Sequence, residues 1–197
     1  ARITPDADTG LPALYLRRHF PRRQTRYGGR VRELHESLGI PRDYARRHCL
    51  PLQEEARDLA DLGTDMYGRP QRLSADALPA WRALRAAADA DGIQLQVVSA
   101  YRSADYQAGI IERKLEAGQS MEAILRVSAA PGFSEHHTGR ALDLTTPGAA
   151  TLEPEFEHTP AFAWLREEAG KFDFHLSFPR DNRHGIAYEP WHWRHGA

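Results

Sequence analysis

Three residues of this chain have side chains suited to holding a metal ion together: His136, Asp143 and His192. His136 and Asp143 stand seven residues apart with Gly139 between them, and His192 lies near the C-terminus. Two imidazoles and one carboxylate form hydrolytic zinc sites, in which a fourth coordination position stays open for water. A further acid, Glu189, can take the proton of that water. These residue types predict a zinc-dependent hydrolase.

The backbone must turn between these residues to bring them to one point. A glycine turn and a strand-like pattern follow His136, so we expect His136 on a loop and Asp143 on a strand. Glu189 and His192 are three residues apart on an expected strand, where odd offsets place side chains on opposite faces. Pro190 lacks a ladder donor and restricts the residue before it. We therefore expect the chain to turn at Pro190.

Helices and strands in mixed order are expected to position these residues. Periodicity predicts helices over 74–91, 103–117, 121–127 and 160–169, and strands over 93–99, 140–145, 172–178 and 186–194. Ser74 is the expected N-cap of the first of these helices. Pro79 sits late for a first-turn proline, which indicates a kink or a delayed start. The fold class is α+β, a small antiparallel sheet with helices packed against it.

The first 70 residues are expected to form a mostly helical extension packed on a main domain of residues 71–197. Several prolines interrupt this extension, and we expect short helices over 11–20, 30–38 and 41–49. Residues 1–50 carry 11 Lys and Arg against 5 Asp and Glu. A solvated basic face and a docking surface for an anionic polymer both explain this excess, and both stay open.

The composition narrows the class of protein. A length of 197 residues suits one domain with an appendage, and 41% hydrophobic with 27% charged residues is typical of soluble globular proteins. A net charge of −1 argues against a nucleic-acid-binding protein. We also expect no membrane span and find no signal peptide in the given chain, because no apolar run is long enough.

Motifs in the second part of the chain resemble those of the zinc D-alanyl-D-alanine carboxypeptidases of the vancomycin-resistance type. Residues 134–143 read Ser-x-His-x-x-Gly-x-Ala-x-Asp, and residues 189–194 read Glu-Pro-Trp-His-x-Arg. The upstream Ser-Ala-Tyr-Arg-Ser, residues 99–103, and the stretch 174–179 are similar to the same family. The resemblance covers residues 74–195. It implies the fold group of lysostaphin, D-Ala-D-Ala peptidases and hedgehog domains.

The resemblance implies a role for each site residue. The ligands of one Zn²⁺ per chain would be His136, Asp143 and His192. Glu189 would be the general base that activates the zinc-bound water, and Arg102 would polarise the substrate carbonyl or clamp its carboxylate. The other residues expected to bind substrate are Gln107, Ser134 and Trp191. Trp191 could equally pack in the core, and Ser134 could cap its loop.

Two residues of the motifs differ from the family or compete within it. His195 follows Trp193-Arg194 where these enzymes often have tyrosine. His137 stands beside His136 and could compete for the metal, although the motif spacing favours His136. Pro190 favours the carboxypeptidase branch over free-dipeptide hydrolases, which tend to have tryptophan there.

The reaction that the resemblance implies is removal of the terminal D-alanine from peptidoglycan stem peptides or other peptides ending in D-Ala-D-Ala. Two alternatives keep the metal but change its use. One is a cell-wall endopeptidase that cuts cross-links or L-Ala–D-Glu bonds, and the other is a non-catalytic, zinc-stabilised binding module. By the same resemblance we expect a monomer outside the cytoplasm, in the periplasm or cell envelope.

Overall fold

The computed structural model describes residues 26–196. The helix expected over 11–20 and much of the basic N-terminal stretch lie outside these residues. The chain folds as two compact units, each assembled from separate stretches of sequence. Of the described residues, the first unit comprises 26–54, 104–134 and 183–186, and the second comprises 55–103, 135–182 and 187–196. The domain boundary expected at residue 70 stays a prediction.

The first unit is helical. Its described helices are α2 (Arg26–Leu38), α3 (Tyr44–His48), α5 (Ala104–Glu116) and α6 (Met121–Val127). They bury a shared apolar core that includes Val31, Leu34 and Ile111. The loop 183–186 joins this unit because the His48 and His184 rings each bond the other's carbonyl, at 2.7 and 2.9 Å. The helix predicted over 121–127 is confirmed.

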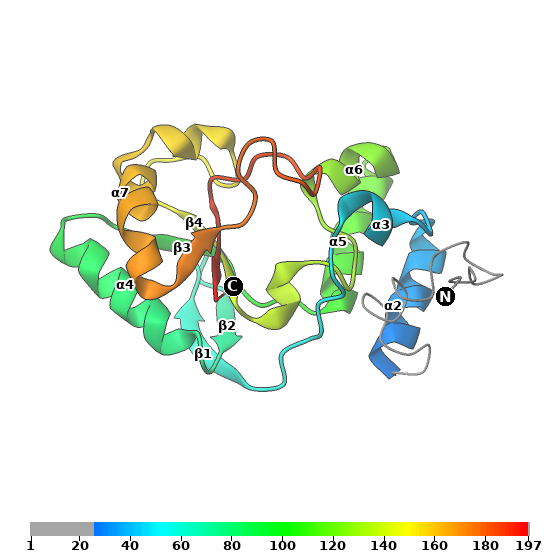
Figure 1. The fold of residues 1–197 in the computed structure, drawn as a ribbon, viewed down its shortest axis with the longest axis horizontal. Helices are drawn as coiled ribbons and strands as arrows, with labels where there is room; N and C mark the ends of the chain where they lie inside the picture. Colours follow the sequence, from blue (N-terminus) through cyan, green and yellow to red (C-terminus); the bar gives the residue numbers. More distant parts are fainter. Residues whose placement is uncertain (1–25, 197) are drawn as a thin grey trace, which may run out of the picture. The chain divides into compact units, whose positions relative to one another are not determined.

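The second unit contains a four-stranded antiparallel sheet with the order β3-β4-β6-β5. Its strands are β3 (Gln96–Ser99), β4 (Ala141–Thr145), β5 (Phe174–Leu176) and β6 (His192–His195). Helices α4 (Leu78–Ala90) and α7 (Pro160–Glu168) pack against this sheet (Figure 1). Three short 3-10 helices complete the unit: η1 (Glu135–Thr138), η2 (Pro154–His158) and η3 (Ala169–Phe172). The predicted α+β class with a small antiparallel sheet is confirmed.

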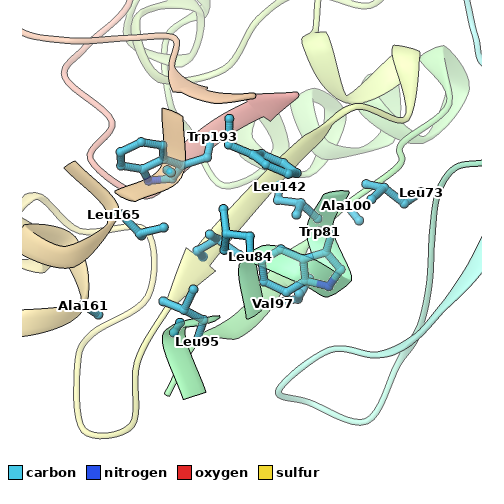
Figure 2. Close-up of a cluster of buried hydrophobic side chains, with 14 of the residues drawn as sticks. Leu73, Trp81, Leu84, Leu95, Val97, Ala100, Leu142, Ala161, Leu165 and Trp193 are labelled. Atoms are coloured by element: carbon cyan, nitrogen blue, oxygen red, sulfur yellow. The ribbon is translucent and has the colours of Figure 1, made fainter. Parts of the chain in front are cut away.

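The two faces of the sheet have different chemistry because strand side chains alternate. Leu142 of β4 and its cross-strand partner Trp193 of β6 enter the apolar core with Trp81 of α4 (Figure 2). Asp143 is one residue after Leu142, and His192 is one residue before Trp193. Both side chains therefore lie on the other face of the sheet. The core therefore anchors two strands whose opposite face carries the candidate ligands.

A β-hairpin precedes α4 where the sequence indicated a helical extension. Strands β1 (Leu59–Thr64) and β2 (Pro70–Ser74) pair in antiparallel fashion. Ser74 is therefore the end of a strand, and its prediction as a helix N-cap was wrong. The delayed helix start is confirmed, because α4 begins at Leu78 with Pro79 in its first turn, where a missing backbone donor costs nothing.

All four strands of this sheet begin later than their sequence patterns predicted, β3 at Gln96 and β4 at Ala141. The last strand covers only His192–His195, so residues 186–191 lie outside the sheet. The chain turns before it, since the His192 amide donates to the Glu189 carbonyl at 3.1 Å. The turn expected at Pro190 is confirmed. The strand expected over 172–178 shrinks to Phe174–Leu176, because η3 occupies the preceding residues.

Candidate metal site and active site

The three predicted metal ligands converge in the second unit. Asp143 and His192 are direct partners across β4 and β6, and His136 comes from η1. His136 Nε2 lies 3.2 Å from Asp143 Oδ2, and His192 Nδ1 lies 3.1 Å from Asp143 Oδ1. One donor atom from each residue falls within 4.8 Å of the others, and all three side chains are buried.

This donor set fits a zinc ion. Tetrahedral zinc with bonds near 2.0–2.1 Å holds its ligand atoms about 3.3 Å apart, close to the 3.2 and 3.1 Å that separate Asp143 from the two histidines. His136 Nδ1 donates to the Ala100 carbonyl at 2.6 Å, so its other nitrogen carries the free lone pair. That Nε2 atom is buried and has no hydrogen-bond partner among the described residues. A cation at this point would satisfy it.

The electrostatics of the cluster also favour a cation. Burial works to raise the pKa of Asp143, but His136, His192 and Arg102 hold it well below its ordinary value. Burial works to lower the pKa of His192, but its hydrogen bonds to Asp143 and Glu135 raise it to about 10. The anionic surroundings therefore attract positive charge, and a metal ion can take the place of a ring proton.

Glu189 lies beside the cluster with the character of a proton acceptor. Its Oε2 is 3.8 Å from His192 Nδ1, and its backbone amide donates to the Phe178 carbonyl at 3.1 Å. Burial raises the pKa of Glu189 to about 7, against the opposing effect of His192. A carboxylate with a pKa near neutrality suits a general base, which must both accept and return a proton.

Arg102 reaches the cluster from the segment after β3. Its Nη1 atom lies 3.9 Å from Asp143 Oδ2, and its side chain is 19% exposed. The guanidinium is thus close enough to the ligands to face a substrate group there, and it keeps access to solvent. Two hydrogen bonds from η1 grip its backbone: the Arg102 amide donates to the His136 carbonyl at 3.2 Å, and His137 Nδ1 donates to the Arg102 carbonyl at 2.6 Å.

His137 stands outside the metal cluster. The group of side chains able to share an ion contains His136 but not His137 among the residues described. The His137 ring is buried, and burial lowers its pKa to about 4. A neutral ring that donates to the Arg102 carbonyl is a structural group, so the choice of His136 as ligand agrees with the geometry.

Glu135 contacts the cluster and was not predicted from the sequence. Its Oε2 accepts from His192 Nε2 at 2.9 Å, and its Oε1 accepts from Arg194 Nη1 at 3.2 Å. Burial works to raise the pKa of Glu135, but the His192 hydrogen bond and charge lower it to about 2. The sequence offered two signals for this contact. Glu135 directly precedes the predicted ligand His136, and Arg194 stands two residues after the predicted ligand His192.

The three other residues predicted to bind substrate are Gln107, Ser134 and Trp191. Gln107 and Ser134 belong to the first unit and are buried there, and Gln107 Nε2 donates to the Ala129 carbonyl at 2.8 Å. Trp191 is partly buried against the apolar core of the second unit, and its carbonyl accepts from the Leu144 amide at 2.9 Å. Their roles in substrate binding stay predictions.

None of the described helices combines the length and apolarity needed to cross a membrane.

Residues 70–197 match the family model VanY, D-alanyl-D-alanine carboxypeptidase. The chain belongs to this family. The VanY-family chain is 30% identical over 146 residues to a D-alanyl-D-alanine carboxypeptidase of Enterococcus faecalis (strain ATCC 700802 / V583), covering 68% of this chain and 52% of the relative. It spans about half the length of the curated relatives that it matches first.

Solved structures of the same kind share the fold. The LdcB LD-carboxypeptidase superposes with a TM-score of 0.65 at 28% identity, over 74% of this chain and 71% of that one. A mutant of the D,D-pentapeptidase VanY in complex with Zn(II) gives 0.59 at 28%, over 75% and 83%. VanYB in complex with D-alanine-D-alanine gives 0.57 at 27%, over 74% and 86%. The predicted family and fold group are confirmed.

Proposed function

We propose that this VanY-family chain is a zinc-dependent D,D-carboxypeptidase that removes the terminal D-alanine from peptidoglycan stem peptides. The observation that carries the proposal is the buried cluster of His136, Asp143 and His192, flanked by Glu189 and Arg102. A purely structural zinc site needs four protein ligands and no base. Here three ligands would leave one position for water, and we propose one Zn²⁺ per chain because the described residues contain one such cluster.

The substrate is proposed from the family and from the neighbours. A VanYB structure contains D-alanine-D-alanine, and it shares the fold at 27% identity. An arginine fork suits the carboxylate or the developing oxyanion of such a peptide. Because peptidoglycan lies outside the cytoplasmic membrane, we place the protein in the periplasm or cell envelope, where it would act as a monomer.

The residues of the site divide the reaction between them. A bound zinc ion would act as a Lewis acid and would lower the pKa of water. Glu189 accepts the proton of the attacking water and later returns it to the amine of the leaving D-alanine. Arg102 stabilises negative charge on the substrate, either the oxyanion that forms during attack or the terminal carboxylate.

A second candidate is an LD-carboxypeptidase, which removes the single D-alanine that follows an L-residue. The LdcB LD-carboxypeptidase has a TM-score of 0.65, above the 0.59 and 0.57 of the two VanY structures. The two reactions use the same metal and base, so only the peptide distinguishes them. A pentapeptide ending in D-Ala-D-Ala tests the first, and a tetrapeptide ending in one D-Ala tests the second.

The test is digestion of both stem peptides by the zinc-loaded protein, followed by mass spectrometry. The proposal predicts loss of one alanine from the pentapeptide. Glu189→Gln should reduce this rate by about 10²–10⁴-fold while zinc stays bound, because only the proton acceptor is lost. The matched control is Glu167→Gln on the exposed side of α7, which should keep the full rate.

Each result decides between the alternatives. Cleavage of the tetrapeptide alone would support the LD-carboxypeptidase, and two larger fragments would indicate an endopeptidase. If zinc binds but neither peptide is cut, the chain is a binding module and the proposed activity is wrong.

A further inference from the structure

The imidazole of His192 lies between two carboxylates. On one side Nδ1 faces the other ligands, 3.1 Å from Asp143 Oδ1. On the other side Nε2 lies 2.9 Å from Glu135 Oε2. A neutral imidazole carries one proton and one lone pair, so the position of the proton decides which nitrogen can bind a metal.

Glu135 is built to accept a hydrogen bond at this place. Its side chain is only 12% exposed, and it belongs to η1, whose 3-10 turn also supplies the ligand His136. Its second oxygen accepts from Arg194 Nη1 at 3.2 Å, and Ser177 also bonds the carboxylate. Arg194 follows His192 by two residues on β6, so both side chains lie on the same face of the sheet.

The arrangement excludes a role for Glu135 as a ligand of the same ion. Its carboxylate contacts the nitrogen of His192 that points away from Asp143, so the ring stands between Glu135 and the cluster. The group of residues able to share an ion, within the part of the chain that the structure describes, likewise omits Glu135. The carboxylate can therefore act on the metal only through the histidine.

We infer that Glu135 is a positioning residue that holds the His192 proton on Nε2 and so presents Nδ1 to the metal. Arg194 holds the second oxygen of Glu135 and keeps the carboxylate in the orientation that accepts this proton. Carboxylates that support a metal-bound histidine in this way strengthen the ligand and fix its ring. The inference rests on the metal site of the proposed function and adds a residue that lies outside the ligand set.

The test is the equilibrium affinity for zinc, measured by competition with a chelating dye. Glu135→Gln keeps the size of the side chain but loses its charge, and we expect its zinc affinity to fall by about 10–100-fold. The zinc affinity of Glu135→Ala should fall at least as far. Glu167→Gln and Glu189→Gln are the controls, and both should bind zinc as the unaltered chain does.

Further measurements separate this role from a general loss of structure. Far-ultraviolet circular dichroism of the metal-free variants should match that of the unaltered chain, and excess zinc should restore peptide cleavage to Glu135→Gln. Unchanged zinc affinity in both Glu135 variants would overturn the inference, as would a loss that excess zinc cannot restore in a folded variant. If the unaltered chain cuts no peptide but the order of zinc affinities holds, the proposed activity fails and the role of Glu135 stands.

Discussion

Individual hydrogen bonds decide which ring nitrogen each candidate ligand would present to a metal ion. The Ala100 carbonyl holds Nδ1 of His136 and leaves Nε2 free, whereas Glu135 holds Nε2 of His192 and leaves Nδ1 free. The two histidines would therefore offer different nitrogens to a shared ion. His136 and His192 need different supporting partners, because a 3-10 turn and a strand point the imidazole ring in different directions.

Gly139 follows the 3-10 turn that carries His136, and its amide donates to the His136 carbonyl at 3.2 Å. Its φ is +65°, and a Cβ there would lie 2.9 Å from Leu59 Cδ2 and 3.0 Å from the Ser74 amide nitrogen. We expect Gly139→Ala to lower the free energy of unfolding by about 1–3 kcal/mol, since both the backbone conformation and the space disfavour a side chain. Chemical denaturation measures this loss.

The matched control is Gly170→Ala. A Cβ at Gly170 meets nothing within 4 Å, and this glycine does not have a positive φ. The same substitution there should be neutral or stabilise by up to about 1 kcal/mol. Equal effects at the two glycines would show that the close approach at Gly139 has no energetic weight.

At the scale of elements, η1 and the segment after β3 are bonded into one frame. The His136 ring bonds the Ala100 carbonyl, and the His136 carbonyl and His137 ring hold both backbone groups of Arg102. The hairpin side supports the same loop, because the Ser74 amide donates to the Gly139 carbonyl at 2.7 Å. The candidate metal ligand His136 and the proposed substrate-binding Arg102 thus share one hydrogen-bonded unit of structure.

His137 is the side chain through which this frame can be tested. His137→Phe removes the donor to the Arg102 carbonyl, and we expect KM for the stem peptide to rise about tenfold, from a displaced arginine. Zinc affinity should stay unchanged, because His137 is not a ligand. His137→Asn is the rescue variant, since its amide can place a donor near the same position. A fall in zinc affinity with an unchanged KM would contradict this role.

The β1–β2 hairpin is organised by Asp65, whose side chain is fully buried. It accepts four hydrogen bonds, from the Tyr67 and Arg69 amides, Arg69 Nε and Gln71 Nε2. Burial works to raise the pKa of Asp65, but the hydrogen bonds from Arg69 and Tyr67 lower it below its ordinary value. The buried carboxylate of Asp65 therefore stabilises a hairpin that the local sequence pattern did not predict.

We expect Asp65→Asn to destabilise the fold by about 1.5–3 kcal/mol at neutral pH, because hydrogen bonds to a charged acceptor are lost. Since the folded pKa is depressed, the contribution of this group is complete above the unfolded value near pH 4 and is lost as pH falls through the folded value. The difference between Asp65→Asn and the unaltered chain should therefore shrink in acid. Denaturation at pH 7 and pH 3 measures it, with Asp61→Asn on the exposed part of β1 as control.

At the scale of the whole molecule, the metal site joins distant parts of the second unit. Its candidate ligands come from a 3-10 turn, a central strand and the last strand. The core residues Leu142 and Trp193, drawn in Figure 2, lie on the opposite face of the same sheet. An ion bound there would connect segments that are far apart in the sequence. Without it, His192 and Arg102 are the positive groups that act on the buried carboxyl of Asp143.

Removal of the metal should therefore lower the thermal stability of the whole chain. A ligand that binds only the folded state adds about 2.7 kcal/mol at a concentration of 100 times its Kd. We expect Tm to rise as zinc is titrated into the chelator-treated chain, and to rise little for Asp143→Ala. Calorimetry follows both transitions, and an identical response of the two proteins would mean that zinc binds elsewhere.

The sequence by itself determined the family and the α+β class, and it predicted the candidate ligands and the candidate general base. His136, Asp143, Glu189 and His192 belong to short motifs whose spacing and residue types define their chemistry. The helix over 121–127 was also predictable, because Ser120 caps it and its apolar residues recur at helical spacing.

Only the tertiary structure decided the contact of Glu135 with His192, the orientation of His137 and the hairpin before α4. Glu135 and His192 are 57 residues apart, and His137 and Arg102 are 35 apart. Local periodicity reports which face of an element is apolar, but it carries no information on which polar groups meet across the fold. Hydrogen bonds between distant segments form only when the packed core has set their separation, and so these partners appear only in three dimensions.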